Sequence, residues 1–520
     1  MDQKILISLS ILFIIIWSYS CRKDFEYAPS TGNLSFSKDT VYLDTVFANI
    51  GSSTYTLKVY NNAKDDLIIP NISLKNGTDS FYRLNVDGVA GTDFTNIPIY
   101  AQDSLFILIE TTIKISDNTK ELLYTDAIEF DKEPHKQSVE LVTLARDAIF
   151  LFPKNNGDSN IETVTLYTDE AGNQIKVTGF ELKNEELHLT NNSPYVIYGY
   201  GIVPKEKELV IDAGARLYFH KDSGLLVKDG ASISINGTLS ENEELLEGQV
   251  IFEGDRLEPD FSKIPGQWGT IWISDGSINN TINYLTIKNA QIGLFVEGQT
   301  SGSTNSITLK NSQIYNSSTY NIWTKNANLV AENLVLGGAG SSALSIENGG
   351  SYSFTHCTIA NYWNKGFRTN ATLEIKNNSL TNFATGFDLE QADFRNCIID
   401  GNIQSELSLR PNNENSFNFN FQNCFIKYSQ IQSSTAQNEL YDFGNSEYYM
   451  NIIEEGSVDF FQPSENDFRI GLASNAINKG DLDVANVVPL DILGEQRNTA
   501  ADLGAYQAKE KEQVTDKVSN

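Results

Sequence analysis

Residues 282–426 repeat one local pattern, in which asparagine follows two alternating apolar residues. Leu285-x-Ile287-x-Asn289 is an early copy of this pattern. The full column comprises Asn289, Asn311, Asn333, His356, Asn377, Asn396 and Asn423, with steps of 22, 22, 23, 21, 19 and 27 residues. A period of about twenty residues, with apolar alternation every second residue and no helical pattern, predicts a stacked β-solenoid.

The asparagine column is interpreted as scaffold. Stacked coils place equivalent residues about 4.8 Å apart, so side-chain amides can hydrogen bond along the stack. Cys357, Cys397 and Cys424 each follow the column by one residue, and the spacing to the next apolar residue makes this slot point inward. We therefore expect buried thiols, and no metal site, because no second ligand type recurs beside them.

The charge balance restricts the possible partners. Lys and Arg number 38 against 67 Asp and Glu, so the formal net charge is −29. Nucleic acid and anionic lipid surfaces both require basic patches, and this composition argues against both. Zinc-protease, nucleophile-elbow, phosphate-loop and EF-hand motifs are absent from the sequence, so we predict no cofactor.

The N-terminus has the pattern of an export signal. Lys4 precedes an apolar run over residues 5–17, which is short for a membrane span. Ser18-Tyr19-Ser20-Cys21 resembles a bacterial lipobox, although Ser18 stands where leucine is usual. The resemblance implies that Cys21 is lipidated and anchors the chain to a membrane. The alternative is an ordinary signal peptide with a cysteine there by chance.

Residues 22–26, Arg-Lys-Asp-Phe-Glu, continue this resemblance. They are similar to the signals that send some Gram-negative lipoproteins to the cell exterior. The implied location is the outer membrane, lipid-anchored and facing the exterior. An odd number of cysteines remains after Cys21, which argues against a disulfide framework.

Short alternating runs without helical segments precede the repeat. They cover residues 41–47, 54–60, 66–74, 81–86, 104–112, 122–130 and 137–145. This number of short strands predicts a β-sandwich. The order Asp44-Thr45-Val46-Phe47, Gly51-Ser52-Ser53 and Leu57-Lys58-Val59-Tyr60 resembles Ig-like modules of the abnormal-spindle/Hydin type, which implies a spacing or binding role.

Both ends of the repeat region resemble right-handed parallel β-helix proteins of the pectate-lyase-like superfamily. The opening is carried by Leu209-Val210-Ile211-Asp212-Ala213-Gly214 and Gly266-Gln267-Trp268-Gly269, and the closing motif by Asp491-Ile492-Leu493-Gly494 and Asp502-Leu503-Gly504-Ala505-Tyr506. The predicted fold is all-β, with an N-terminal Ig-like sandwich, a right-handed parallel β-helix and a C-terminal cap over its open end. The predicted segments are signal peptide 1–20, tether 21–34, sandwich 35–147, linker 148–193, β-helix 194–429, cap 430–507 and disordered tail 508–520.

The candidate site lies on the strand after most of the asparagines. Alternation directs two columns of side chains outward. The columns are Phe295, Trp323, Ser345, Arg368, Asp388 and Ser408, and beside them Glu297, Lys325, Glu347, Asn370, Glu390 and Arg410. Aromatic rings beside mixed charges on a flat face suit a saccharide groove. The alternative is ordinary cross-rung charge pairing.

Two functions follow from this arrangement. The first is a monomeric, non-catalytic surface lipoprotein that binds glycan or a partner protein. The second is a polysaccharide lyase or glycosidase, for which Lys325, Arg368, Asp388 and Glu390 are the catalytic candidates. Resemblance to the lyases of the pectate-lyase-like superfamily implies Ca²⁺ as a cofactor, and only under this second alternative. Binding is favoured because Lys325, Arg368 and Arg410 are the only basic residues in the predicted columns, and fold alone does not decide the matter.

Overall fold

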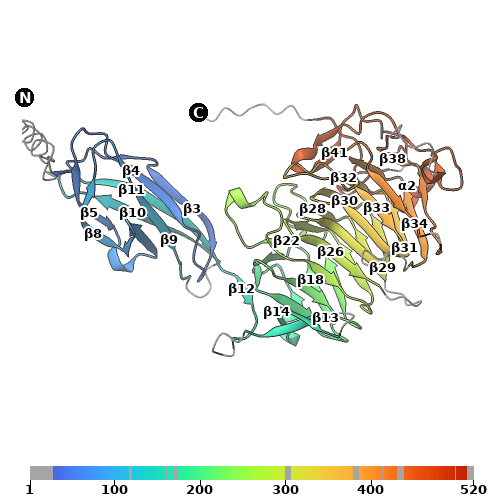
Figure 1. Cartoon of the computed structure of the whole chain (residues 1–520), viewed down its shortest axis with the longest axis horizontal. Helices are drawn as coiled ribbons and strands as arrows, with labels where there is room; N and C mark the ends of the chain where they lie inside the picture. The colour runs from blue at the N-terminus through green and yellow to red at the C-terminus, as the bar shows by residue number, and fades with distance from the viewer. Residues whose placement is uncertain are drawn as a thin grey trace, which may run out of the picture. The chain divides into compact units, whose positions relative to one another are not determined.

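The computed structural model describes residues 27–115, 120–155, 157, 161–168, 172–298, 306–378, 386–412, 414–429, 439–497 and 499–511. The predicted signal peptide and Cys21 lie outside these residues. The described chain divides between Asp147 and Ala148 into two compact units (Figure 1). Among the residues described, no helix has the length and apolar character to cross a membrane.

The first unit is a β-sandwich built from two sheets in its described part. One sheet has the order β1-β5-β10-β11-β3 with β8 beside β5, and the other has the order β2-β4-β9-β6-β7. The strands are β1 (Ala28–Pro29), β2 (Ser35–Phe36), β3 (Thr40–Phe47), β4 (Tyr55–Tyr60), β5 (Leu67–Leu74), β6 (Tyr82–Val86), β7 (Val89–Gly91), β8 (Asp93–Ile99), β9 (Ser104–Thr111), β10 (Glu121–Phe130) and β11 (Gln137–Arg146). Inward residues of both sheets, such as Leu57 and Leu141, share one core. The predicted sandwich is confirmed, and its likeness to Ig-like modules stays a prediction.

The second unit is a parallel β-helix whose stacked strands, in the described part, form three faces: sheet 1 has ten strands, and sheets 2 and 3 are the two halves of one continuous 18-stranded sheet. Sheet 1 contains β12 (Ile149–Leu151), β16 (Tyr195–Ile197), β19 (Arg216–Phe219), β22 (Val250–Gly254), β25 (Leu285–Lys288), β28 (Gln313–Ser317), β30 (Val335–Ala339), β32 (Thr358–Asn361), β35 (Ile398–Gly401) and β38 (Phe425–Ile426). Each rung of the helix runs from sheet 1 to sheet 2 to sheet 3. The predicted β-helix is confirmed.

Sheets 2 and 3 share two long strands that bend from one sheet into the other. Sheet 2 contains β14 (Gln174–Glu181), β17 (Tyr200–Val203), β20 (Gly224–Val227), β23 (Ile271–Ile273), β26 (Ile292–Glu297), the first parts of β29 (Tyr320–Glu332) and β31 (Leu344–Thr355), β33 (Leu373–Lys376) and β36 (Leu407–Arg410). Sheet 3 contains β15 (His188–Leu189), β18 (Glu208–Asp212), β21 (Ser232–Asn236), β24 (Asn280–Asn283), β27 (Ser306–Lys310), the second parts of β29 and β31, β34 (Leu389–Arg395), β37 (Asn420–Gln422) and β39 (Tyr449–Met450).

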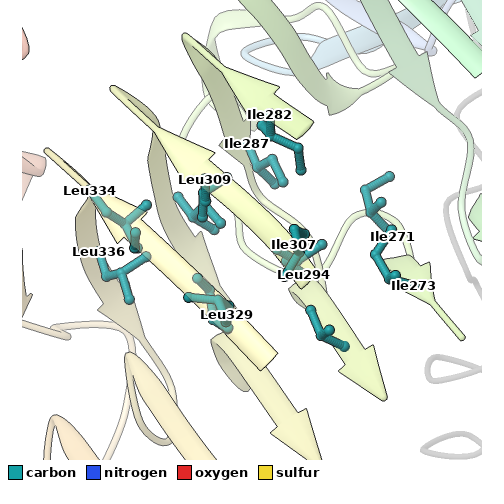
Figure 2. Packing of buried hydrophobic residues seen from close by; sticks show 14 of the residues in the cluster. Ile271, Ile273, Ile282, Ile287, Leu294, Ile307, Leu309, Leu329, Leu334 and Leu336 are labelled. Atoms are coloured by element: carbon teal, nitrogen blue, oxygen red, sulfur yellow. The ribbon is translucent and has the colours of Figure 1, made fainter. Parts of the chain in front are cut away.

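Like residues stack on like in the helix interior. Ile271, Leu294 and Ile322 occupy one register position on successive rungs. Figure 2 shows Ile271 and Leu294 among other interior residues of this core. Each fully buried aliphatic side chain contributes about 1.5–3 kcal/mol through the hydrophobic effect. Cys357 and Cys397 are buried free thiols in this core, as predicted, and burial raises the pKa of both.

The corner between sheets 3 and 1 explains most of the asparagine column. Asn311, Asn333, His356, Asn396, Asn423 and Asn451 stack there with φ between 49° and 55°, the left-handed region that asparagine tolerates best among residues with a side chain. The predicted amide ladder is confirmed where Asn333 Nδ2 donates to Asn311 Oδ1 at 2.8 Å. The prediction that Asn289 and Asn377 belong to this column is wrong. Asn289 follows β25 and Asn377 follows β33, so they lie at the other two corners.

The segment predicted as a linker, residues 148–193, contributes the first rung. Its strand β12 begins sheet 1, and β14 and β15 begin sheets 2 and 3. Strand β13 (Thr163–Thr168) pairs with β14 in a hairpin that packs its apolar side chains on the outer face of sheet 2. The weak sequence pattern reflects this one-sided packing.

The C-terminal region differs from the predicted end cap. Apolar residues of 440–452 pack on the last rung. The chain then turns back over the outer face of sheet 1 through β40 (Phe460–Gln462), β41 (Asp467–Ile470) and α2 (Leu482–Val487). Phe468 and Leu503 there share a core with Val335 and Ile398 of sheet 1. Lys509, which falls in the predicted tail, bridges to Gly471.

Candidate functional site

The register of sheet 2 tests the predicted columns directly. Trp323 pairs with Phe295 and Ser345, and Lys325 with Glu297 and Glu347. On the next two rungs, however, the paired residues are Glu374 with Ser408 and Lys376 with Arg410. Phe295, Glu297, Trp323, Lys325 and Arg410 therefore share the outer face, as predicted.

Arg368, Asp388 and Glu390 do not lie in these columns, so that part of the prediction is wrong. Strand β33 begins at Leu373, and Arg368 belongs to the loop before it. Asp388 and Glu390 flank Leu389, the first residue of β34 in sheet 3. Both side chains are exposed. A hydrogen bond from the Ser416 backbone N–H, at 2.9 Å, holds the pKa of Asp388 below its ordinary value.

The aromatic part of the sheet 2 face is packed against protein. Trp272 and Phe295 are buried, with Leu166 and Val177 of the β13–β14 hairpin against them. The Phe295 ring stacks on Trp323 with centroids 4.6 Å apart. These contacts make the aromatic column a small satellite core, which leaves little ring surface for a sugar.

The charged part of the same face is paired across rungs. Lys376 Nζ lies 2.9 Å from a Glu347 carboxylate oxygen, and Arg410 lies 3.6 Å from Glu374. The Glu347 side chain is only 1% exposed. Lys325 Nζ lies 4.3 Å from the centre of the Trp323 ring. The face thus has the contacts expected of cross-rung pairing.

A concave site lies elsewhere, on the outer side of sheet 1. Its volume is about 230 Å³. Its lining combines residues of sheet 1, of the segment at η3 (Pro259–Phe261), of the loop after β32 and of the returning chain at η5 (Pro463–Glu465). The lining residues are Ser262, Lys263, Lys288, Tyr315, Asn316, Gly338, Tyr362, Trp363, Asn364, Lys365, Ser464, Glu465 and Asn466.

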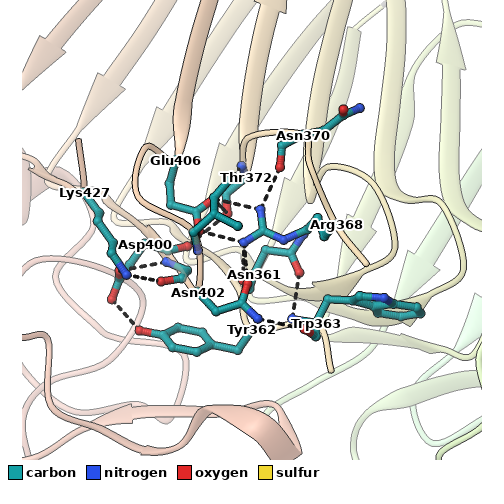
Figure 3. Close-up of polar contacts among 12 residues, drawn as sticks. Asn361, Tyr362, Trp363, Arg368, Asn370, Thr372, Asp400, Asn402, Glu406 and Lys427 are labelled. Atoms are coloured by element: carbon teal, nitrogen blue, oxygen red, sulfur yellow. Dashed lines mark hydrogen bonds and ion pairs between the residues drawn. The ribbon is translucent and has the colours of Figure 1, made fainter. Parts of the chain in front are cut away.

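Arg368 fixes the loop that carries Trp363 (Figure 3). Lys365 belongs to the same loop, between β32 and β33. Its guanidinium donates to both carboxylate oxygens of Glu406, at 2.7 and 2.8 Å, and to the Asn361 carbonyl at 2.9 Å. The side chains of Arg368 and Glu406 are 2% and 0% exposed. Arg368 is therefore a buried structural cation, and the predicted role as an outward ligand contact is wrong.

Further contacts connect this ion pair to the pocket. Asn402 accepts from Arg368 at 2.7 Å and donates to the Trp363 carbonyl at 2.8 Å. Tyr362 donates to Asp400 at 2.8 Å. Burial raises the pKa of Tyr362 and of Asp400. The loop thus presents Tyr362 and Trp363 from a fixed backbone.

The pocket is locally basic in an acidic chain. Its lining holds three lysines and one carboxylate, Glu465, which gives a formal charge of 3 − 1 = +2 among the described lining residues. Lys263 pairs with Glu465 at 2.6 Å, and Lys288 pairs with Glu253, behind the lining, at 2.8 Å. Burial raises the pKa of Tyr315 beside them. Across the described residues, no group of acidic, histidine or cysteine side chains is arranged to hold a metal ion.

Sequence reasoning missed this pocket because its lining comes from distant segments. Lys263, Lys288, Lys365 and Glu465 fall in different rungs or in the returning chain. One signal was present in the sequence, because the interval between β32 and β33 is longer than that between β30 and β31. Irregular insertions in a solenoid are where binding loops commonly occur.

The fold and site define a β-helix protein with an N-terminal sandwich. No protein-family profile and no curated protein matches the chain. Solved structures similar to parts of it include a family 123 glycoside hydrolase from Clostridium perfringens, with 10% identity over 23% of this chain and a TM-score of 0.16. The chain spans 30% of the length of that enzyme.

Two further structures are also similar to parts of the chain. A PapD-like domain of human CEP192 has 11% identity over 24% of this chain and 91% of its own, with a TM-score of 0.16. A GH87 alpha-1,3-glucanase from Streptomyces thermodiastaticus has 9% identity over 77% of this chain and 88% of its own, with a TM-score of 0.22. These scores are too low to bear on function.

Proposed function

We propose that this protein is a non-catalytic glycan-binding lipoprotein of the cell surface, and that the pocket on sheet 1 is its binding site. The observation that carries the proposal is the pocket lining, where the partly exposed Tyr315 and Tyr362, together with the largely buried Trp363, stand beside lysines and side-chain amides. Aromatic rings pack on the apolar face of a sugar ring, and amides and ammonium groups bind its hydroxyls. A concave site with a few convergent polar groups is the usual form of a small-ligand site.

The small number of carboxylates in the described lining of the pocket favours binding over hydrolysis. Glycosidases use two carboxyl groups separated by about 5–9.5 Å across the scissile bond. Of the described lining residues, only Glu465 carries a carboxylate, and it is paired with Lys263. The alternative, a lyase or glycosidase, is tested by incubating the mature chain with acidic and plant polysaccharides in the presence of Ca²⁺. New unsaturated or reducing ends would overturn the non-catalytic role.

Binding is tested by calorimetry with a panel of neutral and acidic oligosaccharides. Trp363→Ala removes the indole from the pocket, and we expect it to weaken binding of every ligand about tenfold or more. Because Trp363 is largely buried, Asn364→Ala, at an exposed lining position, provides a second variant with less effect on folding. Trp323→Ala, on the sheet 2 face, is the matched control. Unchanged affinity in Trp363→Ala and Asn364→Ala would refute the site.

Membrane anchoring rests on the resemblance at Cys21. Cells fed labelled palmitate should incorporate label into the wild-type chain and not into Cys21→Ala. The variant should also leave the membrane fraction, because lipid chains supply the anchor. Equal labelling of both chains would refute the anchor.

A further inference from the structure

We infer that the pocket on sheet 1 takes the terminal, negatively charged sugar of an acidic glycan. This rests on the proposed function and specifies its ligand. The whole chain has a net charge of −29, yet the described lining residues carry a formal +2. A positive concavity in a negative protein concentrates anions at that point and repels them elsewhere.

Lys365 is the cation most accessible to a ligand. It is exposed at the pocket, and no other described residue forms an ion pair with it. Its field reaches the pocket, because the pKa of Glu465 is held low first by the hydrogen bond from Lys263 and further by Lys365. An incoming carboxylate or sulfate would gain a charge-assisted hydrogen bond there.

Lys263 can also turn toward a ligand. Its pair with Glu465 is exposed, with the two side chains 66% and 45% accessible. Such exposed pairs are weak, so a ligand anion can compete with Glu465 for Lys263. Lys288 is less free, because Glu253 holds it at 2.8 Å and both side chains are about three-quarters buried. The basic pocket therefore has two adaptable cations above one fixed cation.

The size of the pocket selects a single terminal sugar. Its volume of about 230 Å³ lies below the range of about 300–1,000 Å³ for sites that enclose drug-sized ligands. One wall is closed by the returning chain, where Asn466 approaches Gly338 so closely that a Cβ at Gly338 would lie 2.6 Å from Asn466 Oδ1. A glycan chain therefore enters by its end and does not lie along the helix.

The test compares matched trisaccharides by calorimetry on the full-length chain without its signal peptide. The probes are an oligogalacturonate, the same oligosaccharide with its carboxyl groups reduced to alcohols, and a sulfated galactan of equal length. We expect the reduced probe to bind about tenfold more weakly than the charged probes, and raising the salt from 50 to 500 mM to weaken only the charged probes. The two charged probes distinguish a carboxylate ligand from a sulfate ligand.

Lys365→Gln should remove most of the preference for charge and leave the reduced probe unaffected. Lys325→Gln, on the sheet 2 face, is the control and should change neither. If the wild-type chain bound charged and reduced probes equally, the anionic ligand would be overturned. If Trp363→Ala then abolished that binding, the pocket would remain the glycan site. A preference for charge unchanged in Lys365→Gln and in a Lys263→Gln/Lys365→Gln double variant would overturn the assignment to these lysines. Absence of binding by all three probes, with binding to a neutral member of the wider panel, would overturn the acidic ligand and keep the glycan site, and absence of binding across that whole panel would overturn both proposals.

Discussion

The outer faces of sheets 1 and 2 contain similar residues in different arrangements. On sheet 2, aromatic and charged side chains repeat at the same register on successive rungs, so most of them, such as Phe295 with Trp323 and Glu347 with Lys376, contact a partner on a neighbouring rung. On sheet 1, the pocket residues come from the sheet, from a long loop and from the returning chain. A regular stack satisfies its own side chains, whereas irregular additions leave polar groups and rings directed into a cavity.

The largest expected effect concerns the ion pair behind the pocket. Arg368→Ala leaves Glu406 buried without its partner, so we expect the free energy of unfolding to fall by about 3–5 kcal/mol. Urea denaturation measures this. Arg410→Ala, whose side chain is 63% exposed in its pair with Glu374, should cost at most about 1 kcal/mol. Equal losses in the two variants would mean that Arg368 does not hold the pocket loop.

The aromatic column on sheet 2 should behave as core and not as a binding face. Trp272→Ala removes a buried indole beneath the hairpin, and about 3–5 kcal/mol of stability should go with it. Glycan affinity of the folded variant should be unchanged. Thermal unfolding measures the stability, and calorimetry measures the glycan affinity. If Trp272→Ala lost affinity but kept its stability, the sheet 2 face would be the binding site.

The corner between sheets 3 and 1 should make stability depend on pH. Burial, with Arg497 nearby, holds the pKa of His356 well below its ordinary 6.5. The unfolded chain therefore binds the proton more readily, so the contribution of neutral His356 is present above pH 6.5 and is lost as the pH falls toward the folded-state pKa. His356→Asn keeps the ladder residue type, and its unfolding midpoint should fall less between pH 7 and pH 5. If the unfolding midpoints of the wild-type chain and of His356→Asn fell by the same amount between pH 7 and pH 5, this prediction would be contradicted.

The smallest effect is expected at Lys325. It lies 3.9 Å from Glu297 in a partly exposed pair, so Lys325→Ala should change stability by at most about 1 kcal/mol. Its glycan affinity should equal that of the wild-type chain. A tenfold loss of affinity would place the ligand on sheet 2 after all.

Periodicity predicted the parts of the structure that repeat. Alternation identified the sandwich strands, the inward cysteine slot and the register of Phe295 with Trp323. It also predicted the amide ladder through Asn333 and Asn396. These features depend on local pattern and on stacking at a fixed spacing, which the sequence carries directly.

The prediction failed where the repeat length changes. Phe367-Arg368-Thr369-Asn370 has the same alternation as Leu373-Glu374-Ile375-Lys376, so pattern alone could not decide which run joins sheet 2. The decision comes from the buried Arg368–Glu406 pair, which holds the first run in a loop. The pocket was unpredictable for a related reason, since the contact between Lys263 and Glu465 joins residues far apart in the chain.

The returning C-terminal chain also bears on the order in which the molecule assembles. A solenoid whose rungs touch only their neighbours can grow one rung at a time. Here Asn333 donates to the Leu490 carbonyl and Asn396 to the Asp481 carbonyl. These corner hydrogen bonds of the mid-stack rungs form only after residues much later in the chain have been synthesised. Such distant contacts slow folding because the intervening loop must close first. The interior of the stack can therefore form first, whereas the pocket is completed only when the chain around η5 docks.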